Sequence, residues 1–148
     1  MLMSLTFVLN SLLVAATMLA HYELLSFLDR WLPQLEHVSS RLRVLVGVGT
    51  IFLGHVAEIW LFGLGYFATL HIGGMGVIEG ETGNAFMDCV YLSFITFTTV
   101  GYGDIVAKGY IRYLTGVEAL TGLILVTWSA SFLFLEMQKY WTGHRKAR

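Results

Sequence analysis

Residues 98–104 form the run TTVGYGD in a chain that is otherwise mostly apolar. Gly101 and Gly103 are spaced by two, and glycine adopts left-handed backbone angles without steric cost. A segment that uses such angles at alternate residues aims successive carbonyl oxygens in one direction. A row of carbonyl oxygens can replace the hydration shell of a monovalent cation. One chain would supply one wall of such a site, and four copies around an axis would enclose it.

A second group of residues that could take part in chemistry consists of ionisable side chains inside apolar segments. His55 and Glu58 are three residues apart in GHVAEIWLF, on one helix face, and Glu118 lies in LTGVEALTG. Their depths allow Glu58 and Glu118 to contact each other, or the backbone that supports residues 98–104. We interpret these groups as a hydrogen-bond network that fixes helix packing. The alternatives are a proton-sensitive switch and a metal site that adds His21, at the end of the first apolar segment.

The elements that position these residues are membrane spans. The chain has 148 residues, of which 56% are hydrophobic and 13% charged, with a mean hydropathy of +0.69. Segments 3–28, 44–70 and 110–135 are long and apolar enough to cross a bilayer, whereas 84–97 suits a re-entrant helix. We therefore predict an all-α membrane protein. The net charge of −1 and the absence of a basic stripe give no sign of a nucleic-acid partner, and the single cysteine excludes an intrachain disulfide.

Basic residues predict the orientation, because loops rich in Lys and Arg stay in the cytoplasm. Such residues follow the first and the third segment, on one side of the membrane if there are three spans: Arg30, Arg41, Arg43, Lys139, Arg145, Lys146 and Arg148. The N-terminus is then outside and the C-terminus cytoplasmic. The first segment lacks a basic start and a clean cleavage site, so we expect a retained span rather than a signal peptide. We expect residues 29–43 to lie along the cytoplasmic interface, separated from the first span by Pro33.

The TTVGYGD string, placed after a short helix and between two spans, resembles the selectivity filter of potassium channels. The surrounding order resembles their two-transmembrane pore module of prokaryotic type, with one additional N-terminal span. The resemblance implies a passive, potassium-selective homotetramer in the prokaryotic cytoplasmic membrane, with K⁺ as the permeant ion and no organic cofactor. It divides the chain into an N-terminal helix 1–28, a linker 29–43, a pore module 44–141 and a basic tail 142–148. Within the module it implies an outer helix 44–70, a turret 71–83, a pore helix 84–97, a filter 98–104 and an inner helix 110–141.

The resemblance also implies roles for single residues of the filter. Ion-binding carbonyls would come from the run Thr99, Val100, Gly101, Tyr102 and Gly103, together with the Thr99 hydroxyl. Thr98 would lie at the base of the filter, and Asp104 at the outer mouth would raise the local cation concentration. The Tyr102 ring would point away from the axis and pack on the pore helix.

The pore helix and the residues after the filter depart from the family pattern. Tyr91, Leu92 and Phe94 are the candidates for packing against the Tyr102 ring, but many members have an aromatic pair where this chain has Tyr91-Leu92. Ile95 stands where some members have an acid, which would leave Asp104 without that partner. The run DIVAKGYIR lacks the proline that many members carry after the filter aspartate.

The inner helix carries candidates for gating. Gly122 lies near the position of the family's hinge, whereas we expect Gly116 to serve packing. Trp128 and Phe132 follow at helical spacing and could narrow the cytoplasmic mouth. The alternative is that both pack against lipid or a neighbouring helix.

Three functions remain open from the sequence. The first is a potassium-selective channel, and the others are a non-selective cation channel and a non-conducting membrane scaffold or subunit. An enzyme such as an intramembrane hydrolase is disfavoured, because we expect no serine or cysteine to pair with a histidine at depth, and no HExxH motif is present. The first span has no arginine ladder, so we expect no voltage sensor. Few residues follow the third span, so we expect no soluble ligand-binding domain.

Overall fold

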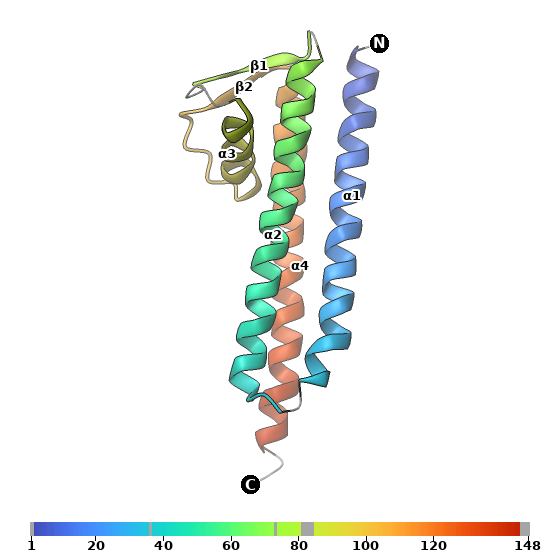
Figure 1. The fold of residues 1–148 in the computed structure, drawn as a ribbon, viewed down its shortest axis with the longest axis vertical. Coiled ribbons are helices and arrows are strands. Elements are labelled where there is room, and N and C mark those ends of the chain that lie inside the picture. The colour runs from blue at the N-terminus through green and yellow to red at the C-terminus, as the bar shows by residue number, and fades with distance from the viewer. Residues whose placement is uncertain (1, 36, 73, 81–84, 146–148) are drawn as a thin grey trace.

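Three long helices lie side by side in the computed structural model, with a short helix and a small sheet at one end (Figure 1). The long helices are α1 (Leu2–Trp31), α2 (Ser40–His71) and α4 (Ile111–Arg145). All three are long and apolar enough to cross a membrane, which confirms the predicted three-span, all-α membrane architecture. The structure describes the chain except for residues 1, 36, 73, 81–84 and 146–148.

The connection between α1 and α2 is shorter than the linker predicted for residues 29–43. Helix α1 ends at Trp31, followed by one 3₁₀ turn, η1 (Leu32–Gln34), that contains Pro33. Proline cannot continue the hydrogen-bond ladder of a helix, which explains the break. Helix α2 then begins at Ser40, so the outer helix starts before the predicted residue 44. Charged residues such as Arg41 are good helix formers, so the helix extends beyond its apolar part.

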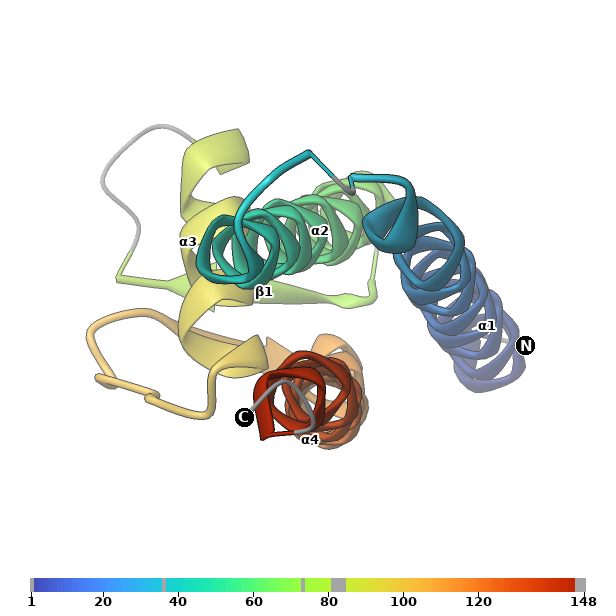
Figure 2. The same ribbon diagram turned by 90° about the horizontal axis from the view of Figure 1, so that it is seen from below.

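The short helix α3 (Ala85–Phe97) corresponds to the predicted re-entrant helix, and residue 84 lies outside the described residues. Seen from below, α3 and α1 lie on opposite sides of the α2–α4 pair (Figure 2). Side chains of α2, α3 and α4 form the main core around this helix. Its fully or almost fully buried members include Phe62, Tyr66, Cys89, Leu92, Leu114 and Leu125. The core therefore fixes α3, and with it the start of the filter segment.

A two-stranded antiparallel sheet lies outside the predicted all-helical plan. Strand β1 (Gly76–Glu79) pairs with β2 (Val106–Gly109), with Gly76 opposite Gly109 and Glu79 opposite Val106. The sheet joins the predicted turret to the segment after the filter. Four residues are too few for a strand to be recognised by its periodicity.

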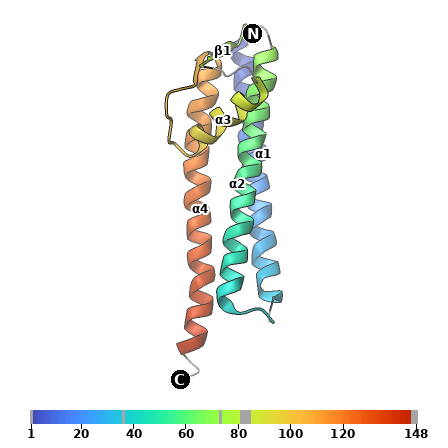
Figure 3. The same cartoon turned by 60° about the vertical axis from the view of Figure 1, so that its left-hand side comes forward.

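Helix α4 is longer than the predicted inner helix and reaches beyond the lower ends of α1 and α2 (Figure 3). It continues to Arg145, so residues 142–145 of the predicted tail are helical, and residues 146–148 lie outside the described part. Near this end, Lys139 forms ion pairs with Asp29 of α1 and with Glu136. These contacts join the lower ends of α1 and α4.

Candidate functional site

The backbone of residues 98–104, the predicted filter that we call the filter segment, alternates in handedness. Thr99, Gly101 and Gly103 have φ angles of 59°, 50° and 81°. Positive φ was expected at the two glycines, and the structure extends the series to a threonine, for which this conformation is uncommon. Strained backbone persists only where its surroundings over-determine it.

Hydrogen bonds to carbonyl groups near the end of α3 hold the filter segment in this conformation. The Thr99 N–H donates to the Thr96 carbonyl at 2.9 Å, and the Gly101 N–H donates to the Ile95 carbonyl at 3.0 Å. Ile95 therefore supports the filter through its backbone, while its side chain is buried in the core. Thr98 continues the helical pattern, because its N–H and its hydroxyl both donate to the Phe94 carbonyl.

Asp104 has a partner that the sequence did not reveal. The Tyr91 hydroxyl donates to Oδ2 of Asp104 at 2.7 Å, and the Ile105 N–H donates to Oδ1 at 3.1 Å. Tyr91 was expected to pack on Tyr102, but its hydroxyl is bonded to the aspartate at the end of the filter. This bond raises the pKa of Tyr91 above its ordinary value, because an ionised phenol could no longer donate to the carboxylate.

The Tyr102 side chain is not covered within one chain. Tyr102 is 73% exposed and Val100 is 52% exposed. Of the residues expected to cover the ring, Leu92 is buried in the core and Phe94 is partly exposed on α3. Packing on its own pore helix is therefore not sufficient to bury this tyrosine.

Glu118 of α4 lies behind the pore helix. Its Oε2 accepts a hydrogen bond from the Tyr66 hydroxyl at 2.5 Å, and its Oε1 lies 2.5 Å from Oγ of Ser93. Ser93 Oγ is also 2.7 Å from the Ile59 carbonyl oxygen. All three polar side chains are fully buried and come from α2, α3 and α4. The network therefore joins the two spans to the helix that carries the filter.

Glu58 lies in a separate network and is not bonded to Glu118, although the depths of the two residues allow a contact. Its Oε1 is 2.8 Å from Nδ1 of His21, and its Oε2 is 2.8 Å from Nδ1 of His55. Oγ of Ser129 lies 3.3 Å from Nε2 of His21 and 3.1 Å from Nε2 of His55. These four side chains form a closed ring that spans α1, α2 and α4, which we call the histidine ring. His21 lies well inside α1, not at the end of the first span as expected.

The histidine ring contradicts the expectation that no serine pairs with a histidine at depth. Ser129, His55 and Glu58 are connected in the order of a hydrolase triad. However, Ser129 is only 4% exposed and lies inside the continuous helix α4, where backbone N–H groups are used by the helix itself. Neighbouring backbone N–H groups of α4 are therefore not free to stabilise an oxyanion, and the burial of Ser129 opposes substrate access, so the geometry of the described residues does not favour hydrolysis.

Aromatic residues surround the histidine ring. The Trp128 ring is 5.3 Å from that of His21, and the Phe97 ring is 5.7 Å from that of His55, measured between centroids. Phe132 packs against a second apolar cluster formed by Leu25, Leu28, Leu32 and Ile51. Trp128 thus lies against a residue of α1 while it is 40% exposed, and Phe132 packs on a cluster shared by α1 and α2. The constriction of the pore by these two residues stays a prediction.

Gly122 lies where α4 passes the end of α3. A Cβ atom at this residue would be 2.2 Å from the carbonyl oxygen of Phe97. Close packing therefore explains the glycine without a bend in α4, and its role as a hinge stays a prediction. A Cβ at Gly116 would meet no described atom within 4 Å, so the packing expected there has no counterpart within one chain.

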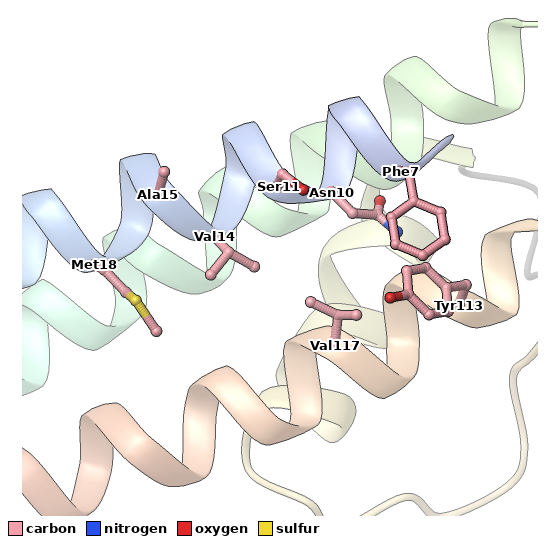
Figure 4. A pocket seen from close by; sticks show the side chains of 8 residues that line it. All are labelled: Phe7, Asn10, Ser11, Val14, Ala15, Met18, Tyr113 and Val117. Carbon is pink, nitrogen blue, oxygen red and sulfur yellow. The ribbon is translucent and has the colours of Figure 1, made fainter. Parts of the chain in front are cut away.

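An apolar pocket of about 370 Å³ lies between α1 and the N-terminal part of α4 (Figure 4). The rings of Phe7 and Tyr113 meet at one end, with centroids 4.9 Å apart. Asn10 also lines the pocket, and although it is only 2% exposed, its amide has no hydrogen-bond partner among the described residues. This end of α1 is thus less completely packed than the histidine ring below it.

Comparison with known proteins gives the family of the chain. A family model described as "Ion channel" matches residues 54–139, which include α3, the filter segment and most of α2 and α4. No curated protein and no solved structure matches the chain. The model covers more than half of the sequence, and the matched range contains α3 together with parts of α2 and α4. The chain is therefore a membrane protein that belongs to the ion channel family.

Proposed function

We propose that the chain is a potassium-selective channel that conducts K⁺ passively through residues 98–104. The observation that carries the proposal is the alternating backbone of Thr99, Gly101 and Gly103 within TTVGYGD. Such a backbone turns successive carbonyls toward one side, where they can replace the water around K⁺. The proposed oxygen ligands of K⁺ are the carbonyl groups of Thr99, Val100, Gly101 and Tyr102, together with the Thr99 hydroxyl.

A homotetramer is the proposed assembly. One chain provides only one wall of oxygen atoms, and it leaves Val100 and Tyr102 largely exposed. A neighbouring copy could cover the Tyr102 ring, which its own pore helix does not. Fourfold symmetry would also bring four Asp104 carboxylates to one mouth, where they would attract cations.

The proposed orientation places the filter end outside the cell. The N-terminal end of α1 lies at the same end of the bundle as α3 and the sheet, and the connection between α1 and α2 lies at the opposite end (Figure 1). Arg41 and Arg43 start α2 at this opposite end, which suits the cytoplasmic side of a prokaryotic membrane. A channel needs no covalent step, so we assign no enzymatic activity.

The decisive experiment is the reversal potential of purified protein in planar bilayers with potassium on one side and sodium on the other. We expect a value near the potassium equilibrium potential. A measurable current that reverses near zero would instead identify a non-selective cation channel. Protein that inserts as a tetramer but carries no current across a range of pH, tension and lipid composition would favour the scaffold. Native mass spectrometry of the same sample tests the tetramer separately.

A further inference from the structure

We propose that His21, His55 and Glu58 bind one divalent transition-metal ion inside the helix bundle, and that the ion fastens α1 to the pore-forming helices. Zn²⁺ is the probe that the ligand set fits best. The site is separate from the filter segment and does not depend on the proposed conduction of potassium.

The three residues converge on one point. One nitrogen from each histidine and one oxygen of Glu58 lie within 4.8 Å of one another. Nδ1 of His21 lies 2.8 Å from Oε1 of Glu58, and Nδ1 of His55 lies 2.8 Å from Oε2 of the same carboxylate. Ligands around a tetrahedral metal with bonds of about 2.0–2.1 Å are separated by about 3.3 Å. Small rotations of the two imidazoles would therefore admit an ion between Nδ1 of His21, Nδ1 of His55 and the carboxylate.

The types of ligand select the class of metal. Two imidazoles with one carboxylate form a common set for zinc and for non-haem iron, with one or more positions left open. Calcium and magnesium prefer sites made of oxygen ligands. The set is supplied by an i,i+3 pair on α2 and by a third residue from another helix, so binding requires the folded bundle.

The hydrogen atoms of the histidine ring provide an independent argument. The ring has four polar contacts, yet two neutral imidazoles, an ionised Glu58 and the Ser129 hydroxyl supply only three protons for them. If the Nδ1 protons go to Glu58, the serine can donate to only one Nε2 atom, and the buried ring carries a negative charge. Such an uncompensated buried charge is costly.

A divalent ion gives the Glu58 carboxylate a direct counter-charge and frees the histidine protons for Ser129. A hydroxide at the open coordination position would neutralise the positive charge that remains. With the ion on the Nδ1 atoms, each Nε2 carries its proton and can donate to Ser129, whose oxygen has two lone pairs. The observed Ser129 distances of 3.3 Å and 3.1 Å suit these two hydrogen bonds. Ligating histidines generally donate their other N–H group in this way, which fixes the orientation of the ring.

The surroundings bury most of the proposed site, while the His55 side chain is 17% exposed, which leaves room for water at an open coordination position. His21 is fully buried, Glu58 is 4% exposed, and the rings of Trp128 and Phe97 lie against the two imidazoles. The other buried carboxylate that faces α2 here, that of Glu118, is already engaged by Tyr66 and Ser93.

Lipid gives little hydrophobic drive for helix association, so a metal bond is an effective link between spans. His21 lies outside the matched range 54–139, whereas His55 and Glu58 lie inside it.

The experiment uses the full-length protein in detergent after treatment with a chelator, titrated with Zn²⁺ by calorimetry. We expect one Zn²⁺ per chain in the wild type. His21→Gln and His55→Gln should each weaken binding by more than about 100-fold, because each removes a ligand. The matched controls are His71→Gln, which removes an exposed imidazole bonded to the Phe67 carbonyl, and Glu118→Gln, which removes the other buried carboxylate. Both controls should retain one Zn²⁺ per chain.

Titration of the wild type with Co²⁺ keeps the proposal testable if a histidine variant does not fold. Visible absorption bands of a low-coordinate nitrogen–oxygen site should saturate at one Co²⁺ per chain. The proposal is overturned if the stripped wild type binds neither ion at concentrations that saturate ordinary protein sites. It is also overturned if His71→Gln, but not His55→Gln, abolishes binding. These measurements need no ionic current, so their failure would leave the proposed channel function untouched, and the reverse also holds.

Discussion

Oγ of Ser93 lies 2.5 Å from Oε1 of Glu118, which joins the pore helix to the third span. The same hydroxyl oxygen is 2.7 Å from the carbonyl of Ile59 on the second span. A single serine therefore connects three elements directly behind the helix that carries the filter. Ser93 has one proton and two acceptors within reach, so the identity of its partner at position 118 decides how well this junction is satisfied.

Glu118→Ala should destabilise the assembled protein, whereas Glu118→Gln should change it little. Alanine removes the carboxylate that accepts from the buried Tyr66 hydroxyl, and loss of that partner costs about 1–3 kcal/mol. Ser93 can still donate to the Ile59 carbonyl. Glutamine can accept from Tyr66 through its oxygen and donate to Ser93 through its amide. Thermal unfolding in detergent tests this, with the exposed Glu23→Gln as the control. Equal loss of stability in both Glu118 variants would contradict the proposed bonding.

Gly101→Ala and Gly103→Ala should abolish potassium conduction while the protein still inserts and assembles. Their φ angles of 50° and 81° would cost alanine about 1–2 kcal/mol each. A Cβ at either position meets no described atom within 4 Å of the same chain, so folding of the bundle should be preserved. Reversal potentials provide the measurement, and Gly49→Ala, in an open position on α2, is the matched control. Normal selectivity in both filter variants would remove the argument from aligned carbonyls.

Gly122→Ala should lower stability more than Gly49→Ala does. The added Cβ would be 2.2 Å from the Phe97 carbonyl oxygen, and such overpacking costs about 1–3 kcal/mol. Thermal unfolding of the two variants measures the difference. If Gly122→Ala unfolds like the wild type but alters channel opening, the glycine serves as the hinge predicted from the sequence.

Tyr91→Phe should destabilise the conducting conformation of the filter near Asp104. We expect a faster loss of current during sustained recording at low potassium. The substitution removes only the hydroxyl that donates to Asp104 at 2.7 Å. Tyr113→Phe, on the outer end of α4, is a suitable control because it also removes one phenolic hydroxyl. An unchanged rate of current decay in Tyr91→Phe would show that the hydrogen bond to Asp104 does not stabilise this end of the filter.

The pH dependence of the same contact follows from the raised pKa of Tyr91. A group with a raised pKa in the folded state contributes its full stabilisation below its ordinary value, and loses it only as the pH rises through the raised value. For a phenol this window lies above about pH 10. The rate of current decay in the wild type should therefore be constant between about pH 7 and about pH 9. A marked acceleration in that range would indicate that Tyr91 ionises early and is not protected by Asp104.

Several features were readable from the sequence because they depend on local chemistry. Three apolar runs predicted three spans, since backbone groups in lipid must be satisfied within a helix. The spacing of Gly101 and Gly103 predicted the alternating backbone, because left-handed angles are accessible mainly to glycine. His55 and Glu58 could be placed on one face of α2, because helical periodicity is a property of the segment itself.

Other features depend on which helices meet, and only the tertiary structure decided them. Depth alone allowed Glu58 to pair with Glu118, but helix rotation directs the first toward α1 and the second toward α3. His21 and Ser129 join the histidine ring from segments that are 108 residues apart, and a buried serine carries no sequence signal for such a role. The partner of Asp104 was likewise hidden, because Tyr91 and Asp104 meet only after the chain reverses at the end of α3. The sequence thus determined the secondary structure and membrane character of each segment. The packing of the helices determined which buried polar groups pair with one another.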